Sequence, residues 1–230
     1  PGLTVGHIPV LCEEAVRFLV RDASGVYVDG TFGRGGHSTH ILRQLSPQGR
    51  LIGFDVDPSA IAVGRQLESQ DQRFEIIHEP FGNLADAAAP GTTLSGVLLD
   101  IGFSSPQMDE GHRGWSVMRD GPLDLRMNPQ ASQPASVWLQ RVSVQELAWV
   151  FHRLGDEDDP LLAQRLAEGV LEQQRRAGKF TSTMQLGGAI RHVVGSCTGS
   201  SKVAGAKLPM RALTAFLNRE MEQLVDALHG

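Results

Sequence analysis

The sequence has few of the residues that mark several common classes of protein. It contains two cysteines, Cys12 and Cys197, which lie far apart and form no C-x-x-C pair, so neither a disulfide framework nor a zinc site is predicted. No apolar run approaches the length of a membrane-spanning helix, and no signal peptide opens the chain. No His, Asp or Glu cluster has metal-ligand spacing. These absences favour a reducing compartment, no membrane contact and no bound metal.

An excess of basic residues is also missing. The chain has 26 acidic and 21 basic residues, a formal net charge of −5. It is therefore no general binder of polyanions, and any contact with nucleic acid requires a local basic patch or a substrate presented by other proteins. With 230 residues, 41% of them hydrophobic, the chain is long enough for one good core or for a core and a small satellite domain.

Glycine is concentrated at one point, where a strand-like run at 26–29 meets an apparent helix. The connecting sequence is Gly30-Thr31-Phe32-Gly33-Arg34-Gly35-Gly36-His37. Glycines at a strand-to-helix turn let the backbone approach a ligand closely, because no Cβ stands in the way. We expect Gly33, Gly35 and Gly36 to lie against a cofactor, although an ordinary tight turn would also favour glycine.

A second apolar strand ends in Asp55. A glycine turn, a helix, a strand and a terminal acid together are typical of α/β sheets that hold a nucleoside, with the carboxylate on the ribose hydroxyls. The alternative is a surface acid beside Asp57 that caps the next helix. The third glycine of the dinucleotide fingerprint would fall at position 38, which is Ser38. This favours a cofactor without a pyrophosphate, such as S-adenosyl-L-methionine, over a nicotinamide cofactor.

Strand and helix patterns alternate over the first hundred residues. Strands are predicted at 26–29, 50–55, 74–77 and 96–100, with helices near 7–22, 38–45, 59–69 and 83–89. Nearly continuous apolar strands between helices imply a doubly wound, mostly parallel α/β sheet that is covered on both faces. In the first helix the expected apolar face comprises Val10, Leu11, Ala15, Phe18 and Leu19.

The alternation then stops. A loop rich in glycine, proline and charge spans 102–132, helical patterns alone follow from 137 to about 192, and 195–206 reads as a mobile linker. A last amphipathic helix is predicted at about 210–228. The sequence thus predicts a cofactor-binding core at 1–105, a substrate loop, helical insertion and linker at 106–206, and a helix at 207–230 that returns to the core.

Polar groups follow the fourth strand, where an acceptor atom would meet a bound methyl donor. The candidate catalytic residues are Asp100, Ser104, Ser105, Pro106 and Gln107. Hydroxyl, amide and carbonyl acceptors can take the N–H hydrogen bonds of an exocyclic amine and favour a pyramidal nitrogen. Methylation at ring carbon 5 would require a nucleophilic cysteine here, and none is present. A plain turn before a loop is the structural alternative.

The loop that follows combines arginines with a tryptophan in an otherwise acidic chain. The candidate RNA contacts are Arg113, Trp115, Arg119 and Arg126. Arginines could hold phosphates, and Trp115 could stack on an extruded base or, equally, anchor the loop to the core. Trp138 and Trp149 have helical spacing among apolar neighbours, which favours core packing.

Several motifs occur together and in order: His7-Ile8-Pro9-Val10-Leu11, the glycine turn, Gly53-Phe54-Asp55-Val56-Asp57-Pro58, Ser104-Ser105-Pro106-Gln107 and Arg119-Asp120-Gly121-Pro122-Leu123-Asp124-Leu125-Arg126-Met127. This set closely resembles the small-subunit ribosomal RNA (cytosine-N4)-methyltransferases of bacteria and organelles. The resemblance is strong over 7–128 and weaker over 129–194. It implies a Rossmann-like methyltransferase sheet and the use of S-adenosyl-L-methionine.

Site residues follow from the resemblance, position by position. It implies cofactor contacts from Gly35, Gly36, His37, Asp55, Phe81, Asp100 and Gln107. Gly35 and Gly36 would lie under the methionine part, Phe81 would flank the adenine, and Asp100 and Gln107 would lie beside the reacting methyl group. Phe81 can also be read as a core residue.

Three features depart from the family pattern. Leu208 and Thr214 replace two arginines, and the family's Gly-Glu-Glu-Arg-Phe segment is changed from Gly155 onward. The third feature is the sheet, which lacks the further strands of the family and leaves its fourth strand as an apolar edge. We therefore expect either a fragment or a chain whose edge is covered by a partner or by a second copy.

The resulting hypothesis is a methyltransferase that acts on the exocyclic N4 of a cytidine in small-subunit ribosomal RNA. Its predicted partner is that RNA within an assembled or partly assembled subunit, in the bacterial cytoplasm or in an organellar matrix or stroma. Two alternatives stay open. One is a non-catalytic S-adenosyl-L-methionine-binding ribosome-assembly factor, which the lost arginines favour. The other is a nicotinamide-dependent oxidoreductase, which Ser38 argues against.

Overall fold

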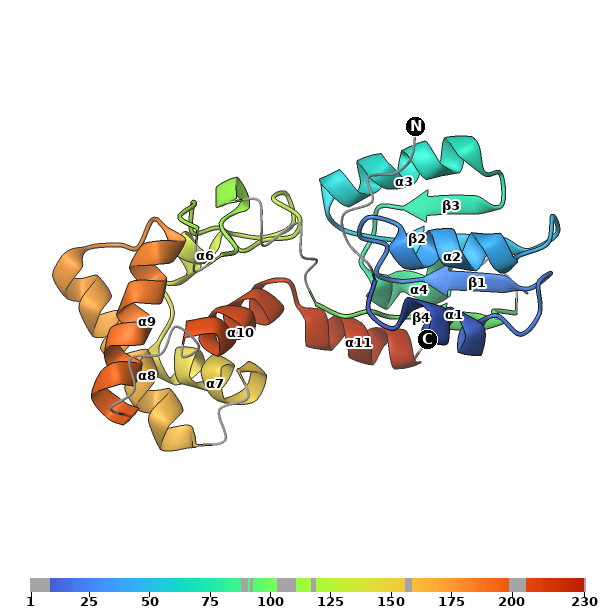
Figure 1. Ribbon diagram of the computed structural model, residues 1–230. Coiled ribbons are helices and arrows are strands. Elements are labelled where there is room, and N and C mark those ends of the chain that lie inside the picture. The colour runs from blue at the N-terminus through green and yellow to red at the C-terminus, as the bar shows by residue number, and fades with distance from the viewer. Residues whose placement is uncertain are drawn as a thin grey trace. The chain divides into compact units, whose positions relative to one another are not determined.

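The chain divides into two compact units, each with its own core. The computed structural model describes residues 9–87, 91, 93–102, 111–116, 119–155, 159–198 and 206–229. One unit comprises Pro1–Gly102 and Glu220–Gly230, and the other comprises Phe103–Arg219. We call them the α/β unit and the helical unit, and Figure 1 labels their elements.

The α/β unit is built on a parallel sheet of four described strands. These are β1 (Val26–Asp29), β2 (Arg50–Phe54), β3 (Phe74–Ile77) and β4 (Gly96–Leu98), in the order β3-β2-β1-β4 (Figure 1). Val28 of β1 lies opposite Ile52 on one side and Val97 on the other. This order is that of the first four strands of a doubly wound Rossmann sheet, so the predicted fold class is confirmed.

Helices cover both faces of this sheet. On one face, residues of α1 (Cys12–Leu19), α2 (Gly36–Gln44) and α3 (Pro58–Gln70) share a buried cluster with Tyr27, Leu51 and Ile76. On the other, η1 (Phe81–Asn83), α4 (Leu84–Ala87) and α11 (Glu220–His229) contribute to a cluster around Val28, Ile52 and Phe54. Successive strand residues point to opposite faces, which is why these strands are apolar at nearly every position.

Strand β4 forms one edge of the described sheet. It pairs with β1, and no other described strand borders it. Val97 and Ile101 are 39% and 37% exposed along this edge. The prediction that the fourth strand is an apolar edge is confirmed, while its cover by a partner or a second copy stays a prediction.

The predicted apolar face of the first helix is confirmed only in part, since Ala15 and Leu19 pack against the buried cluster. Val10, Leu11 and Phe18 are 65%, 68% and 64% exposed, whereas Cys12 and Val16 are buried. Cys12 and Val16 are one helical turn apart and share the sheet-facing side, while Phe18 is rotated about 200° from Val16. The spacing of apolar residues predicted the helix. It did not predict which of the two apolar sides of this helix packs on the sheet.

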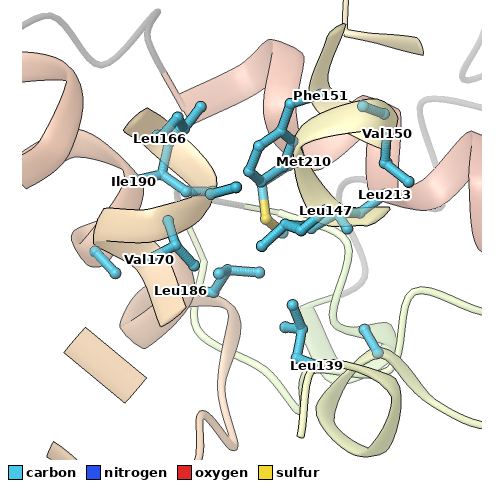
Figure 2. Close-up of a cluster of buried hydrophobic side chains, with 14 of the residues drawn as sticks. Leu139, Leu147, Val150, Phe151, Leu166, Val170, Leu186, Ile190, Met210 and Leu213 are labelled. Atoms are coloured by element: carbon cyan, nitrogen blue, oxygen red, sulfur yellow. The ribbon is translucent and has the colours of Figure 1, made fainter. Parts of the chain in front are cut away.

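The helical unit consists of five described α-helices and a 3₁₀ turn. They are η2 (Gly111–Arg113), α6 (Ala135–Trp138), α7 (Val144–Leu154), α8 (Pro160–Ala177), α9 (Thr183–Thr198) and α10 (Lys207–Leu217). Ser143 and Glu146 form a capping box at α7, and Asp159 caps α8 with Pro160 in its first turn. Figure 2 shows the core, in which Leu147, Val150 and Phe151 of α7 meet Met210 and Leu213 of α10.

The C-terminal segment differs from its prediction. Instead of one helix at 210–228, α10 and α11 are separated at Asn218 and Arg219. Arg219 has a φ of 54°, and a left-handed residue ends a helix. The division of the chain falls at this point, so α10 belongs to the helical unit and α11 to the α/β unit. The predicted 207–230 segment is therefore shared between the two units.

The described residues offer little for metal, disulfide or membrane chemistry. No three His, Cys, Asp or Glu side chains among them come together as metal ligands. Cys12 is a free, buried cysteine, and burial raises the pKa of its thiol. None of the helices in this part of the chain combines the length and apolarity that a membrane crossing requires.

Candidate functional site

The glycine turn lies at the centre of the carboxyl edge of the sheet. Because β1 is flanked by β2 and β4, the residues that follow it are held from both sides. Gly30 N donates to Leu98 O at 2.9 Å, and Phe32 N donates to Phe54 O at 3.0 Å. The turn is thus a fixed part of the edge at which open α/β sheets bind ligands.

Asp55 is connected directly to the glycine turn. Its Oδ2 accepts a hydrogen bond from Gly33 N at 2.8 Å, and its Oδ1 accepts one from Asp57 N at 2.8 Å. Gly33 has a φ of 55°, a conformation that favours glycine. Burial raises the pKa of Asp55 to about 6, against the hydrogen bonds from Asp57 and Gly33, which lower it.

The helix-capping alternative for Asp55 is wrong, because Asp57 performs that role. Asp57 Oδ1 accepts from Ser59 N at 2.9 Å at the start of α3, with Pro58 in the first turn. Asp55 does not cap this helix. An ionised carboxylate has about four acceptor positions, and two on Asp55 are filled by backbone N–H groups. The remaining capacity fits the two hydroxyls of a ribose.

Internal packing accounts for part of the glycine requirement. Gly35 has a φ of 75°, and a Cβ there would lie 2.9 Å from the Phe32 ring. A Cβ at Gly36 would collide with the side chain of Pro9. Gly35 also begins α2, and its carbonyl accepts from both Thr39 N and Thr39 Oγ1, at 2.9 and 2.7 Å. These glycines shape the turn, while their contact with a cofactor stays a prediction.

His37 and Asp100 lie on the β4 side of the turn. His37 is buried, with Nε2 3.1 Å from Val10 O and Nδ1 3.9 Å from Asp100 Oδ2. Asp100 N donates to Thr31 Oγ1 at 2.7 Å, while its side chain is 53% exposed. The structure therefore brings two predicted site residues together and leaves the Asp100 carboxylate open to solvent.

Sequence reasoning missed Asp29 and Thr31. Asp29 is fully buried at the end of β1, where Oδ2 accepts from Ser38 Oγ at 2.6 Å and Oδ1 from Thr31 N at 3.2 Å. Burial raises the pKa of its carboxyl. Thr31 in turn holds the backbone of Asp100. The sequence contained a signal for Asp29, because it stands at the end of β1 just as Asp55 stands directly after the end of β2.

Other predicted site residues are placed differently or are not described. Phe81 is 8% exposed within the cluster of Val28, Ile52 and Phe54, which fits the alternative reading as a core residue, while its contact with an adenine stays a prediction. Ser104, Ser105, Pro106 and Gln107 lie outside the described residues.

Two of the four candidate RNA contacts are committed to the fold of the helical unit. Trp115 is only 4% exposed, so it anchors its loop, while its stacking on an extruded base stays a prediction. Arg126 makes a bidentate ion pair with Asp124, at 2.6 and 2.7 Å, and donates to Pro129 O and Ser132 O. Arg113 is partly exposed and Arg119 is exposed.

The strand order and the edge define a class, namely Rossmann-like α/β proteins with a glycine turn hydrogen-bonded to a strand-end carboxylate. A family model described as the MraW methylase family matches residues 4–230. The chain belongs to this methylase family.

The chain is also similar to individual proteins. The ribosomal RNA small subunit methyltransferase H of Shewanella denitrificans is 40% identical over 227 residues, which cover 97% of this chain and 70% of that protein. Among solved structures, an rRNA methylase from Streptococcus thermophilus is 28% identical with a TM-score of 0.30, over 36% of this chain and 51% of that one. The sequence similarity therefore extends over both units.

Proposed function

We propose that this protein transfers a methyl group from S-adenosyl-L-methionine to the exocyclic N4 of a cytidine in small-subunit ribosomal RNA. The observation that carries the proposal is the contact between Asp55 Oδ2 and Gly33 N, 2.8 Å long, at the carboxyl edge of the sheet. It places an acceptor for ribose hydroxyls beside a turn that a cofactor can approach closely. Membership of a methylase family supplies the reaction class.

The edge fits a nucleoside better than a dinucleotide. In the dinucleotide fingerprint a third glycine allows close packing of helix on strand. Here that position is Ser38, which is fully buried and donates its Oγ hydrogen to Asp29. A hydrogen bond between Ser38 and Asp29 thus links the helix after the glycine turn to the strand before it. This arrangement supports S-adenosyl-L-methionine over a nicotinamide cofactor.

Each residue of the edge then has a role in the proposed reaction. Asp55 holds the ribose, and the backbone at Gly35 and Gly36 lies against the methionine part. S-adenosyl-L-methionine, when bound, supplies an electrophilic methyl group. Asp100, positioned by Thr31 Oγ1 at 2.7 Å, lies on the side of the edge where the acceptor base would approach. The family resemblance places the amine-orienting groups in the turn at 104–107.

Presentation of the cytidine is part of the proposal. The amine of a paired or stacked cytidine cannot reach a methyl group at the strand ends, so the base must be extruded or already unpaired. In a chain with net charge −5, a partly assembled small subunit that exposes the cytidine should be a better substrate than naked RNA. We infer that the protein acts where small subunits assemble, in the bacterial cytoplasm or in an organellar matrix or stroma.

One observation favours a second candidate, a cofactor-binding assembly factor without catalysis. Thr214 occupies a position where the resembling family carries an arginine. It is buried, and its Oγ1 donates to Met210 O within α10 at 3.0 Å. A buried threonine cannot contact RNA as an exposed arginine would. The two candidates share the cofactor site and differ in the chemistry performed on RNA.

The test combines binding with product analysis. Isothermal titration with S-adenosyl-L-methionine should show binding, and Asp55→Ala should weaken it by about 1.5–3 kcal/mol, the range for hydrogen bonds to a charged group. NAD should not bind. Mass spectrometry of ribosomal RNA nucleosides should detect loss of an N4-methylated cytidine in a deletion strain, and its return with the parent gene but not with Asp55→Ala. Binding without any change in the nucleosides would favour the assembly factor.

A further inference from the structure

A cavity of about 350 Å³ opens on the surface of the helical unit. Gln145, Glu146 and Trp149 of α7 and Phe216 of α10 line it. Trp149 is 52% exposed, although its spacing in the sequence favours core packing. Phe216 meets Trp149 edge-on at 6.4 Å between ring centroids and lies 5.0 Å from Trp138 on its other side. The exposed indole is thus held by an aromatic cluster rather than left loose on the surface.

Free hydrogen-bonding groups border this aromatic surface. Glu146 Oε2 accepts from Ser143 N and Ser143 Oγ, at 2.9 and 2.8 Å, which fixes the carboxylate. These hydrogen bonds lower the pKa of Glu146, so it is ionised at neutral pH. Its Oε1 and the side-chain amide of Gln145 make no hydrogen bond within the described part of the chain. A ring stacked on Trp149 would find an acceptor and an amide at its edge.

A cation lies one helical turn further along α7. Arg153 follows Trp149 by four residues, so the two side chains are neighbours on the helix surface. Arg153 is exposed and forms no ion pair with any residue that the structure describes. The carboxylate of Glu146 in the lining favours a hydrogen-bond donor as occupant of the cavity, and the guanidinium of Arg153 favours an anion beside it. Nucleotides combine a flat ring, polar ring edges and an adjacent phosphate.

We propose that Gln145, Glu146, Trp149 and Phe216 form a binding site for an unpaired nucleobase of the RNA substrate, with Arg153 at a neighbouring phosphate. The site takes bases with an exocyclic amine, because the carboxylate of Glu146 can only accept hydrogen bonds. Its residues all belong to the helical unit, whereas the proposed cofactor edge belongs to the α/β unit. The inference rests on the proposed function only in taking RNA as the ligand.

The experiment measures the affinity of the full chain for fluorescein-labelled single-stranded RNA of about 12 nucleotides containing A, C and G, a length within known site sizes. Trp149→Ala should weaken binding by about 10-fold or more, because base–aromatic stacking is lost. Trp149→Phe keeps an aromatic face and should stay within about 3-fold of the parent. An oligouridine should bind the parent more weakly, since uracil has no exocyclic amine.

Two further variants separate the contacts. Arg153→Ala should lower the slope of log K against log salt by about 1, as loss of one phosphate contact requires. Leu161→Ala is the matched control, because Leu161 is 67% exposed in the same unit and lies outside the cavity lining. It should leave RNA affinity unchanged. Circular dichroism of each variant tests whether a loss of binding reflects loss of folding.

The proposal is overturned if Trp149→Ala binds the RNA as tightly as the parent does. It is also overturned if N-acetyl-argininamide, rather than RNA, quenches tryptophan fluorescence in the parent but not in Trp149→Phe, since the cavity would then hold a basic protein side chain. Titration with S-adenosyl-L-methionine separates this outcome from failure of the proposed function. Trp149→Ala should retain cofactor affinity, and Asp55→Ala should retain RNA affinity. RNA binding that depends on Trp149 without methyl transfer would support this site and contradict the proposed reaction.

Discussion

The α/β unit and the helical unit hold their polar groups in different ways. At the carboxyl edge of the sheet, the Asp55 carboxylate accepts from the backbone amide of Gly33, and the backbone amide of Asp100 donates to the Thr31 hydroxyl. In the helical unit, Arg126 forms an internal ion pair with Asp124. Trp149 of α7 is exposed, although its spacing in the sequence predicts a core position. Strand order alone brings the first set together, whereas helix packing decides which members of the second set face solvent.

The largest expected effect tests whether the two units are energetically separate. Phe54 and Phe151 are fully buried, one in each core. Each Phe→Ala change should destabilise its own unit by about 3–5 kcal/mol, the usual cost of a large cavity. Phe151→Ala should leave S-adenosyl-L-methionine affinity intact under conditions where the α/β unit is folded. Chemical denaturation with cofactor titration checks this, and equal loss of binding in both variants would contradict separate units.

A second test asks whether Arg126 serves the fold or the substrate. Removing its guanidinium leaves Asp124 and two carbonyls without their donor, so Arg126→Ala should cost about 1.5–3 kcal/mol in stability. Arg211→Ala, at an exposed arginine of the same unit, is the control and should cost little. Thermal denaturation and RNA binding measure the two effects. Reduced RNA affinity at unchanged stability would restore Arg126 as a substrate contact.

A third test compares two glycines with positive φ. Gly35 in the α/β unit has a φ of 75°, and Gly178 in the helical unit has a φ of 93°. Alanine at either position should cost about 1–2 kcal/mol in backbone strain. Only Gly35→Ala should also lose cofactor affinity, because its Cβ presses on Phe32 within the turn that Asp55 holds. Calorimetry decides, and normal binding by Gly35→Ala would make the turn purely structural.

The smallest expected effect concerns pH. The pKa of Asp55 is raised to about 6, so its carboxylate is protonated in acid and becomes a poorer acceptor for ribose hydroxyls. Cofactor affinity should be full above about pH 7 and about tenfold lower at pH 5, where roughly one carboxyl in eleven is ionised. The ligand-free protein should show the opposite trend in stability. Protonated Asp55 favours the folded state, so this contribution is present below about pH 4 and is lost as pH rises through about 6.

Asp55→Asn provides the control for the pH experiment. An amide oxygen accepts hydrogen bonds without titrating, so the variant should bind more weakly at neutral pH but with a flat profile between pH 5 and 7. Calorimetric titration over this range measures both proteins. A pH dependence of the same size in Asp55→Asn would assign the titration to another group.

Much of the α/β unit could be predicted because its signals are local in the chain. The glycine turn, the strand that precedes it and the acid after the next strand all fall within 26–55. Parallel strands joined by helices place their carboxyl ends at one edge, so the meeting of Gly33 with Asp55 follows from strand order. Only Ala15 and Leu19 of the predicted face of α1 pack on the core, because apolar residues occur on two sides of this short helix and only contact with the sheet selects one.

In the helical unit, the sequence predicts the helices but not which side chains are exposed. Its helices and caps could be predicted, since periodicity and the Ser143–Glu146 capping box are written in neighbouring residues. The arginines that form internal contacts could not be predicted. Arg126 donates to carbonyls of a loop whose conformation depends on residues far away in the sequence. The backbone N of Met127 donates a hydrogen bond to Asn218 Oδ1 at 2.7 Å, and the two residues are 91 positions apart in the chain.

By itself, the sequence determined the strands and their alternation with helices, the glycine turn, the strand-end acids and the methylase family to which the chain belongs. The tertiary structure decided which side chains remain available at the surface. It buried Trp115 and Phe81, tied Arg126 to Asp124 and left Trp149 open beside a cavity. The physical reason is that backbone geometry is set by near neighbours, whereas exposure depends on segments that are far apart in the chain.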